Sequence, residues 1–555
     1  MKYQSEIIAE IVDKRGHEKS SLHYESECIQ SWIDENKGNY PKLCDYQSEW
    51  LNYINENHIG VFPYETLTDV TEATVNNVVP YSYKSAILSG QTLVNLSQIN
   101  KFSISGSGTV IHSGITNLMK TNTTYTRILV ITKNTLTGAN STNGVAHSIG
   151  NDNFSYYVDN TAIKIELNFT GVVVNKTVTT GSDLTQYKNF SGIRIFAVNT
   201  GGVLEGYELI LEGDYTNVDI PYFEGMQSVK MPVLKTTGKN LFDKSKVKYN
   251  TTLNAFNGLE EENNLYMSSD FINVKPNKSY ASNHMGVIFY YDENKSFIDA
   301  FDSPNLPQKF TTPNNCKYVR VRSWEQYSTI EKQREIVELE QLEEGTQATT
   351  YEPYKSNILT VNEPVELRGI GDVRDTLDCL TGEYTQAIYE YTFTGDEDWQ
   401  IGGGDTGGYK YFIILNGQLP IRPNYNVNLN IPISCDRLPI ITYTDFDNRL
   451  KSVGINLSHY FRLNFSDCNS NDGATVEDLK AYLKANPTTV QYPISKSVKT
   501  VDLSVTDQDG NQLSKIKPIE GTMHIKTDGS PIKPTFTSEI PVEAITQNLA
   551  SFTGE

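Results

Sequence analysis

The sequence has little cysteine and no long hydrophobic run. Six cysteines are spread over 555 residues without a C-x-x-C pair: Cys28, Cys44, Cys316, Cys379, Cys435 and Cys468. A set this sparse argues against a disulfide scaffold and predicts free, buried thiols in a reducing compartment. No stretch approaches the roughly 18 apolar residues of a membrane span. The sequence therefore predicts no membrane span and no dependence on disulfides.

The sequence also has fewer basic than acidic residues. The chain has 47 Lys and Arg against 67 Asp and Glu, for a formal net charge of −20. Such a field repels a phosphate backbone, and no Lys/Arg-rich run provides a local exception, so nucleic acid is excluded as an expected partner. The first 20 residues carry acids where a signal peptide would have its apolar core, which predicts synthesis in the cytoplasm.

What the chain does have is size and aromatic content. It is 38% hydrophobic with 34 Tyr and 21 Phe, enough for three to five folded domains at roughly 100–200 residues each. Residues 1–57 carry apolar stripes at helical spacing, which predict a small helical segment that docks onto another protein. From about residue 80, short runs such as TRILVIT (126–132) and GVIFYYD (286–292) alternate with turn residues. This pattern predicts a mainly β chain of sandwiches or barrels.

One late segment predicts a helix instead. In TVEDLKAYLKANP (475–487), Thr475 can cap the first turn and Asp478 occupies the third helical position. Asn486-Pro487 would end the helix. The third β domain should therefore contain one short helix.

Two long segments open and close in a similar way. GQTLVNLS (90–97) and GKNLFDKS (238–245) share Gly, then Leu three positions on, then Ser seven positions on. LILEGDYTNVDIPY (209–222) and QLEEGTQATTYEPY (341–354) share Glu-Gly and Pro-Tyr at equal spacing. Duplication of one sandwich explains the order of these matches, and chance is the alternative because the interiors do not align. The glycine permits a positive φ where a last strand leaves its sandwich.

Several phrases resemble proteins of one structural class. The matching runs are GKNLFD (238–243), INVKPNKSY (272–280), IFYYDENKSFI (288–298), FTTPNNCKYVRVRS (310–323), QLEEGTQATTYEPY (341–354) and VELRGIGDVRDTLDCLTGEYTQ (365–386). They resemble β-sandwich modules of tail and baseplate proteins, of upper-baseplate or receptor-binding type, from phages that infect Gram-positive bacteria. The likeness covers about residues 230–535, and VPYSYKSAILSGQTLVNL (79–96) extends it upstream.

The resemblance implies a chain of jelly-roll-like sandwiches similar to carbohydrate-binding modules, with a small N-terminal helical domain. The predicted division is 1–75 (helical docking domain), 76–232 (sandwich 1), 233–357 (sandwich 2), 358–500 (β domain 3 with one short helix) and 501–555 (C-terminal β extension). The chain would be a virion tail component, made in the host cytoplasm. Its expected partners are other tail or baseplate proteins, host cell-wall polysaccharide and further copies of itself, most simply as a trimer.

Three functions of different class stay open from the sequence. The first is a tail protein that attaches the virion to host-surface glycans. The second is a purely structural connector without glycan binding, and the third is a polysaccharide depolymerase. Attachment and connector rank above the enzyme, because no residue pattern requires catalysis to explain it.

Motifs for metal, cofactor or nucleophilic chemistry are weak. HEKSSLH (17–23) spaces its histidines six positions apart rather than the four of a zinc helix. IGGGDTGG (401–408) lacks the G-K-[ST] of a phosphate loop and suits a hairpin loop. DQDGN (507–511) places its Gly too early for a calcium loop and suits a tight turn. No cofactor, metal or enzymatic activity is expected.

A glycosidase needs two carboxylates roughly 5–10 Å apart. The sequence offers two runs: Glu338, Glu340, Glu343 and Glu344, then Asp396, Glu397 and Asp398. On strands these side chains would alternate faces, so solvated surface charge is the expected role of both runs.

Glycan binding requires aromatic faces on which sugar rings can lie. The predicted glycan-binding residues are Tyr290, Tyr291, Trp324, Tyr327 and Trp399. For each of them a place in a core or interface is the competing interpretation.

Overall fold

The computed structural model describes residues 64–541 with gaps. The gaps are 68–71, 79–82, 84, 107–108, 139–145, 149–156, 160–162, 167, 196–198, 217, 219, 231–232, 285, 303–306, 324–328, 364, 405–409, 415–418, 422–431, 439, 441–451, 456–460, 465–474 and 529–534. Nearly all regular structure in the described residues is β, which confirms the mainly β prediction. No helix in this part of the chain is long and apolar enough to cross a membrane.

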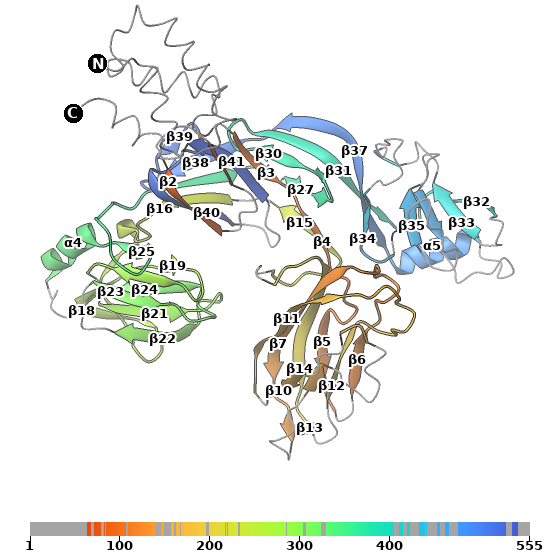
Figure 1. Ribbon diagram of the computed structural model, residues 1–555, viewed down its shortest axis with the longest axis horizontal. Coiled ribbons are helices and arrows are strands. Elements are labelled where there is room, and N and C mark those ends of the chain that lie inside the picture. Colours follow the sequence, from red (N-terminus) through yellow and green to blue (C-terminus); the bar gives the residue numbers. More distant parts are fainter. Residues whose placement is uncertain are drawn as a thin grey trace, which may run out of the picture.

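Two antiparallel sheets pack face to face as a central body (Figure 1). In spatial order, the first sheet contains β1 (Tyr64–Leu67), β41 (Thr535–Pro541), β3 (Ser85–Ser89), β30 (Thr376–Asp378), β31 (Glu383–Phe393), β37 (Thr488–Thr500) and β34 (Ser434–Cys435). The second contains β2 (Glu72–Val78), β40 (Gly521–Asp528), β16 (Val233–Gly238), β26 (Ser356–Val361), β38 (Leu503–Asp507) and β39 (Gln512–Leu513). Two small sheets adjoin them, formed by β27 (Glu366–Leu367), β15 (Met226–Lys230) and β4 (Thr92–Val94), and by β28 (Gly369–Ile370) and β29 (Val373–Arg374).

Alternation of buried and half-buried residues explains why these strands form a sandwich. In β16 every second residue is buried, and β3 shows the same period of two. Leu88 and Phe536 of the first sheet and Leu234 and Met523 of the second are all fully buried in one shared core. Each strand thus contributes one apolar face to the layer between the sheets.

The chain leaves the central body three times and returns to it each time. We call residues 95–225 the first insert, 239–355 the second insert and 394–487 the third insert. Within the third insert, the short strand β34 returns to pair with β37 at the edge of the first central sheet. In Figure 1 the second insert lies beneath one end of the central body, the first beneath its middle and the third at its other end. The linear series of domains predicted from the sequence is therefore corrected, because segments 76–232, 233–357, 358–500 and 501–555 all supply strands to the two central sheets.

The first insert is a sandwich of two four-stranded sheets. One contains β10 (Ile163–Ile165), β9 (Ala146–Ser148), β12 (Ser191–Ile195) and β6 (Val110–Ser113). The other contains β11 (Gly171–Thr179), β7 (Thr124–Asn134), β14 (Leu204–Glu212) and β5 (Lys101–Ile104), and β8 (Thr137–Gly138) pairs with β13 (Asn199–Gly201). Ile128, Leu209 and Leu211 belong to the core of the central body, so this insert is fixed by apolar packing.

The second insert also has two sheets. The larger contains β17 (Lys248–Leu253), β18 (Glu260–Ser268), β24 (Tyr318–Arg322), β21 (Val287–Tyr291) and β22 (Phe297–Asp302), with β19 (Ile272–Asn273) beside β24. The smaller contains β23 (Gln308–Thr311), β20 (Ser279–Ser282) and β25 (Leu342–Glu344), and the insert adds a 3₁₀ turn, η3 (Lys244–Lys246), and helix α4 (Ile330–Leu339). Its cores are its own, since no residue of 239–355 is among the described residues of the central core.

The third insert combines a small sheet with the predicted helix. The sheet contains β32 (Gln400–Gly404), β33 (Lys410–Ile414), β36 (Phe461–Asn464) and β35 (Ser452–Ile455). Helix α5 (Val476–Ala485) begins with Thr475 and Asp478 in a reciprocal capping box and ends at Asn486, as predicted. Leu479 and Leu483 of α5 share a core with Val490 of β37, which attaches this insert to the central body.

The predicted N-terminal docking domain covers residues 1–75. Residues 1–63 lie outside the described part, and β1 and most of β2 fall within the remainder. Because β1 pairs with β41 and β2 with β40, the last residues of that segment belong to the central sheets and not to a helical domain.

The first two inserts share a hydrogen-bond frame, which supports duplication of one sandwich. Asn95 donates through Nδ2 to the carbonyl oxygens of Glu208 and Phe223, and its Oδ1 accepts from the amides of Ser97 and Ile210. In the second insert Asn240 donates to the carbonyl oxygens of Glu340 and Glu352 and accepts from the amides of Phe242 and Leu342. Each asparagine ties the opening of its insert to the closure.

The first two inserts also share a hydrogen bond between a lysine amide and the hydroxyl of a tyrosine five residues later. The Lys120 amide donates to Tyr125 Oη at 2.9 Å, and the Lys275 amide donates to Tyr280 Oη at 2.8 Å. Each lysine also pairs with the glutamate of the closure: Lys120 Nζ lies 2.8 Å from Glu212, and Lys275 Nζ lies 3.0 Å from Glu344. The glycines that follow, Gly213 and Gly345, have φ of 115° and 149°, as predicted for the repeated closure.

Candidate functional site

Two of the predicted glycan-binding aromatics lie in the cores of the second insert. Tyr290 is 6% exposed and Tyr291 is 3% exposed, on opposite faces of β21. The Tyr291 hydroxyl donates to the Gly258 carbonyl oxygen at 2.7 Å, which satisfies the buried hydroxyl within the insert. A sugar ring needs an accessible aromatic face, so neither tyrosine is carried forward as a binding residue.

Trp399 is also a core residue. It is 4% exposed and packs on Phe393 with ring centroids 5.2 Å apart. Its indole Nε1 donates to Glu397, which also accepts from the Gly395 amide. Glu397, which belongs to the acidic run before Trp399, therefore joins the loop backbone to a buried indole through hydrogen bonds. Trp324 and Tyr327 lie outside the described residues.

The glutamates of the second insert are not all solvated, which corrects the expectation of surface charge. Glu338 belongs to α4 and Glu344 is half-buried, but Glu340 and Glu343 are 1% and 3% exposed. Glu340 accepts from Ser282 Oγ at 2.6 Å and from the His284 amide at 2.8 Å, whereas Glu343 accepts from Thr349 Oγ1 at 2.8 Å. These buried carboxylates hold the insert together through hydrogen bonds.

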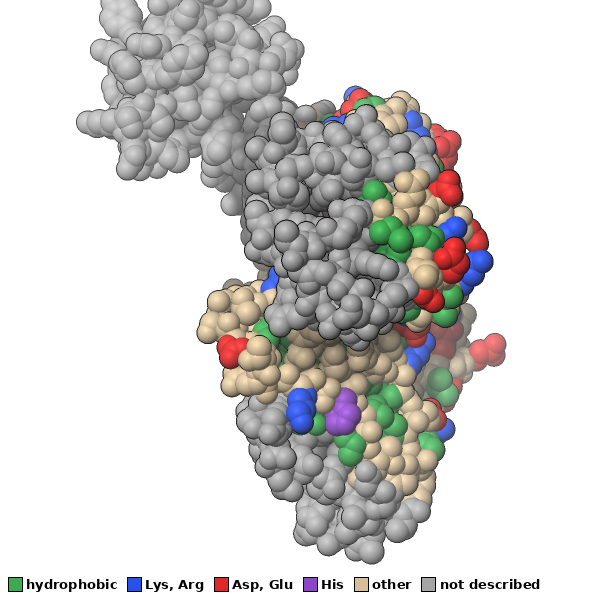
Figure 2. Space-filling model, turned by 90° about the vertical axis from the view of Figure 1, so that its right-hand side faces the viewer, with side chains coloured by type: hydrophobic (Ala, Val, Ile, Leu, Met, Phe, Trp, Pro, Cys, Tyr) green, Lys and Arg blue, Asp and Glu red, His purple; other side chains and the backbone are tan. Residues whose placement is uncertain are grey.

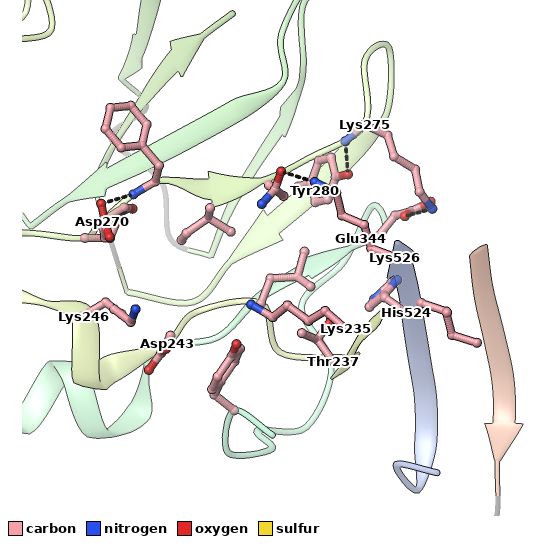
Figure 3. A pocket seen from close by; sticks show the side chains of 17 residues that line it. Lys235, Thr237, Asp243, Lys246, Asp270, Lys275, Tyr280, Glu344, His524 and Lys526 are labelled. Atoms are coloured by element: carbon pink, nitrogen blue, oxygen red, sulfur yellow. Dashed lines mark hydrogen bonds and ion pairs between the residues drawn. The ribbon is translucent and has the colours of Figure 1, made fainter. Parts of the chain in front are cut away.

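A cleft of about 160 Å³ lies where the second insert meets the central body (Figure 3). Four segments that are distant in the sequence line it: Lys235, Thr237, Leu241, Asp243 and Lys246; Ser269, Asp270, Phe271, Ile272, Asn273, Lys275 and Tyr280; Glu344 and Tyr354; and His524, Ile525 and Lys526. Its polar groups and half-buried aromatic residues make it a candidate binding site.

The floor of the cleft is one face of the second central sheet. Lys235 and Thr237 project from β16, and His524 and Lys526 project from the neighbouring β40. The antiparallel register places Lys235 directly opposite Lys526 and Thr237 directly opposite His524. All four side chains therefore share one face of the sheet and point towards the second insert.

The opposite wall comes from the second insert. The Lys275–Glu344 ion pair faces β40, and Asn273 Oδ1 accepts from Lys526 Nζ at 2.7 Å (Figure 3). Phe271 is half-buried, with the Arg320 guanidinium 5.2 Å from its ring centroid. Tyr354, on the linker that returns to the central body, has Lys235 Nζ 5.9 Å from its ring centroid. The insert is thus joined to the sheet by polar contacts around the cleft.

The charge of the cleft differs from that of the chain. Its lining has four lysines and three carboxylates, whereas the whole sequence is acidic by 20 charges. On the side of the molecule shown in Figure 2, acidic and basic side chains of the described residues are interspersed. Among the described residues no three His, Cys, Asp or Glu side chains are grouped so that they could hold a metal ion.

Burial in the cleft perturbs one histidine. The loss of solvation, followed by the positive charge of Lys275, lowers the pKa of His524 from 6.5 to about 4, with Glu344 acting in the opposite direction. Lys526 and Lys235 share its sheet face. Unfolded chains therefore take up a proton below about pH 6.5, whereas the folded protein stays neutral at this position until about pH 4.

We expect this histidine to make the protein less stable in acid. The stability present above pH 6.5 is lost as the pH falls towards 4, by about 2 kcal/mol. Urea unfolding at pH 7 and pH 4.5 measures the effect for the wild type and for His524→Gln. The difference between the two proteins should change by that amount between the two pH values, and a difference independent of pH would contradict the assignment.

A third repeated motif, besides the openings and closures, marks one wall of this site in the sequence. KTNTTY (120–125) and KPNKSY (275–280) share Lys, Asn and Tyr at equal spacing, and both mark the lysine–tyrosine element described above. The floor residues Lys235, His524 and Lys526 carry no comparable motif. The structure brings them to the cleft through sheet register alone.

Comparison with known proteins identifies no relative. No family model, no curated protein and no solved structure matches this chain.

Proposed function

We propose that the chain is a non-enzymatic structural component of a phage tail or baseplate that attaches the virion to a Gram-positive host by binding cell-wall polysaccharide. The sequence phrases that resemble such modules support this proposal, as does an architecture of β modules inserted into one body. We further propose that the inserts are of the jelly-roll, carbohydrate-binding type. The protein would be made in the host cytoplasm and reside in the virion tail beside other tail or baseplate proteins.

The observation that carries the proposal is the cleft beneath the second insert. Polysaccharide recognition needs an aromatic surface for the sugar ring and polar groups for its hydroxyls. Phe271 and Tyr354 are both half-buried and line the cleft, so part of each ring is accessible. Asp243, Asp270 and Thr237 lie beside them and can accept or donate hydrogen bonds. The cleft therefore combines both requirements in one place.

A homo-oligomer, most simply a trimer, would increase avidity. A single cleft of this size accommodates a short saccharide segment, for which individual affinity is low. Several copies held together bind a repeating polymer with a high effective local concentration, which raises overall affinity without new contacts.

Cell binding tests the proposal. Fluorescently tagged full-length protein should bind saturably to intact Gram-positive cells and to their purified wall polysaccharide, and it should compete with phage for the cells. Tyr354→Leu removes the aromatic face but keeps much of the apolar volume, and we expect at least a tenfold loss of affinity, because the surface on which the sugar ring would lie is lost.

The matched control is Phe256→Ala. Phe256 is 93% exposed, belongs to the second insert and does not line the cleft, so its replacement should leave binding unchanged. Absence of binding by folded wild-type protein would overturn the attachment function. Release of reducing ends from the polysaccharide would instead favour a depolymerase.

A purely structural connector is the second candidate, and a specific observation favours it. The first and third inserts share apolar cores with the central body, through residues such as Leu209 and Leu479. Rigid packing of this kind is what a spacer between neighbouring tail proteins requires. A connector predicts that the chain assembles with tail proteins while neither cells nor polysaccharide bind it.

A further inference from the structure

The second insert is attached to the central body in a different way from the other two inserts. Apolar side chains such as Leu209 and Leu211 fix the first insert in the central core, and Leu479 fixes the third against β37. Among the described residues, none of 239–355 belongs to the central core or packs against it as a partly buried hydrophobic side chain. The apolar side chains of the second insert fill two cores of its own.

The hydrogen-bond frame that the first two inserts share shows which residues make this difference. The amides of Ile210 and Leu342 occupy the same place in that frame, so the residues that follow them, Leu211 and Glu343, are equivalent. Leu211 is buried in the central core, whereas the Glu343 carboxylate is buried within the second insert and accepts from Thr349 Oγ1 at 2.8 Å. A position that anchors the first insert by apolar packing is thus charged in the second.

A second anchoring position differs in the same way. By the same alignment, Leu209 of the first insert corresponds to Gln341 of the second. Gln341 donates through Nε2 to Glu343 at 2.8 Å and accepts from the Glu352 amide at 2.8 Å, so its hydrogen bonds stay within the second insert. Two of the apolar anchors of the first insert are therefore replaced by polar side chains that do not reach the central core.

Two neighbouring chain crossings and polar contacts join the second insert to the central body. The Gly238 amide donates to the Lys355 carbonyl oxygen at 2.9 Å, so the two crossings lie side by side. Across the cleft, Lys526 Nζ donates to Oδ1 of the exposed Asn273 at 2.7 Å. Water competes for such a contact, so breaking it costs much less than separating an apolar interface.

We infer that the second insert is a hinged unit, which turns about the paired crossings at Gly238 and Lys355 and thereby opens and closes the cleft. The wall residue Asn273 moves with the insert, whereas the floor residues Thr237 and His524 stay with the central sheet (Figure 3). A saccharide that contacts both wall and floor holds the hinge closed, because only the closed arrangement offers it all of these contacts. The hinge itself does not depend on the proposed function, whereas its closure by a saccharide rests on it.

Distances between two spin labels on the full-length protein measure the hinge without a ligand. The test pair is Glu262→Cys/Val498→Cys, with Glu262 exposed on β18 of the second insert and Val498 58% exposed on β37 of the central body. The matched pair is Thr177→Cys/Val498→Cys, with Thr177 exposed on β11 of the first insert. Serine first replaces three cysteines that would compete for the label, Cys28, Cys44 and Cys468, whereas Cys316, Cys379 and Cys435 are buried.

The hinge predicts different widths for the two distance distributions. In pulsed electron paramagnetic resonance, the distribution for the second insert should be at least twice as wide as that for the first insert. The pair Glu262→Cys/Lys309→Cys lies within the second insert, with Lys309 exposed on β23, and should give a narrow distribution because the insert turns as one unit. Equal widths for the two inserts relative to the central body would overturn the hinge.

Removing the contact across the cleft should favour the open arrangement. Asn273→Ala deletes the acceptor of the Lys526 hydrogen bond, and the distances of the test pair should shift away from those of the closed arrangement. The control is Asn294→Ala, at an exposed position of the same insert that does not line the cleft, and it should leave the distances unchanged. The same response to both variants would contradict a hinge held closed at the cleft.

Purified wall polysaccharide tests closure by a ligand. At saturation it should narrow the distribution of the test pair to the width found for the first insert, and it should leave the matched pair unchanged. Polysaccharide that binds without narrowing the distribution would overturn closure, while the hinge and the attachment function stand. Absence of polysaccharide binding would overturn the attachment function and closure together, whereas the widths measured without ligand still decide the hinge.

Discussion

Replacing Arg127 with methionine is expected to lower the free energy of unfolding of the first insert by about 3–5 kcal/mol. Arg127 is fully buried, with Nε 2.8 Å from Glu208 and Nη1 2.8 Å from Asp159. Methionine fills much of the volume but leaves two buried carboxylates without their guanidinium. Lys176 remains 2.7 Å from Asp159 and offsets part of that cost. Urea unfolding, with hydrogen exchange of the β7 and β14 amides to localise the change, measures it.

The control for this prediction is Lys120→Met in the same insert. The Lys120–Glu212 pair has a similar length, 2.8 Å, but its side chains are 60% and 49% exposed. Solvent screening limits such a pair to about 1 kcal/mol or less. Equal effects of the two substitutions would contradict the assignment of Arg127 as the charged centre of this core.

Asn240→Ala is expected to destabilise the second insert by about 2–4 kcal/mol. The side chain is 1% exposed and makes four hydrogen bonds with backbone groups, which alanine leaves without their partner. Because Asn95 makes the equivalent four bonds in the first insert, Asn95→Ala should have a similar effect there. Hydrogen exchange resolved by segment shows which insert opens in each variant.

Asn294→Ala provides the comparison for the asparagine variants. Asn294 is exposed in the turn between β21 and β22, so its replacement should change the free energy of unfolding by less than about 0.5 kcal/mol. If Asn240→Ala were equally mild, or if it loosened both inserts alike, the shared frame would not be what holds each insert closed.

Local features of the fold could be predicted from the sequence because short-range chemistry determines them. The capping residues of α5, the positive φ of Gly213 and Gly345, and the turn at Asp507–Gly510 all follow from residues within a few positions of one another. Helix α4 was not predicted. Of its glutamates, only Glu338 entered the sequence analysis, as expected surface charge, although Thr329 before IEKQREIVEL provides an N-cap.

The nested topology could not be predicted in this way. β3 pairs with β41 and β16 pairs with β40, across hundreds of residues, and nothing local in a strand specifies a partner so distant.

The predicted alignment of the two repeated openings is wrong by three positions. Matching Leu93 with Leu241 followed residue identity, whereas the hydrogen bonds make Leu96 the equivalent of Leu241, since both amides bond to the closure strand.

The cleft was missed for the same reason. Its floor and wall come from segments near residues 240, 275, 350 and 525, which become neighbours only after the sheets form. The aromatics chosen from the sequence, Tyr290, Tyr291 and Trp399, are the ones that fill cores. Ring size alone favours burial, so aromatic content could not separate core residues from a binding surface.

The most direct test of the account is an experimental structure of the full-length protein with fragments of wall polysaccharide bound. We expect density for a saccharide in the cleft, with a sugar ring against Tyr354. Saccharide density on another surface, with an empty cleft at saturating concentration, would contradict it.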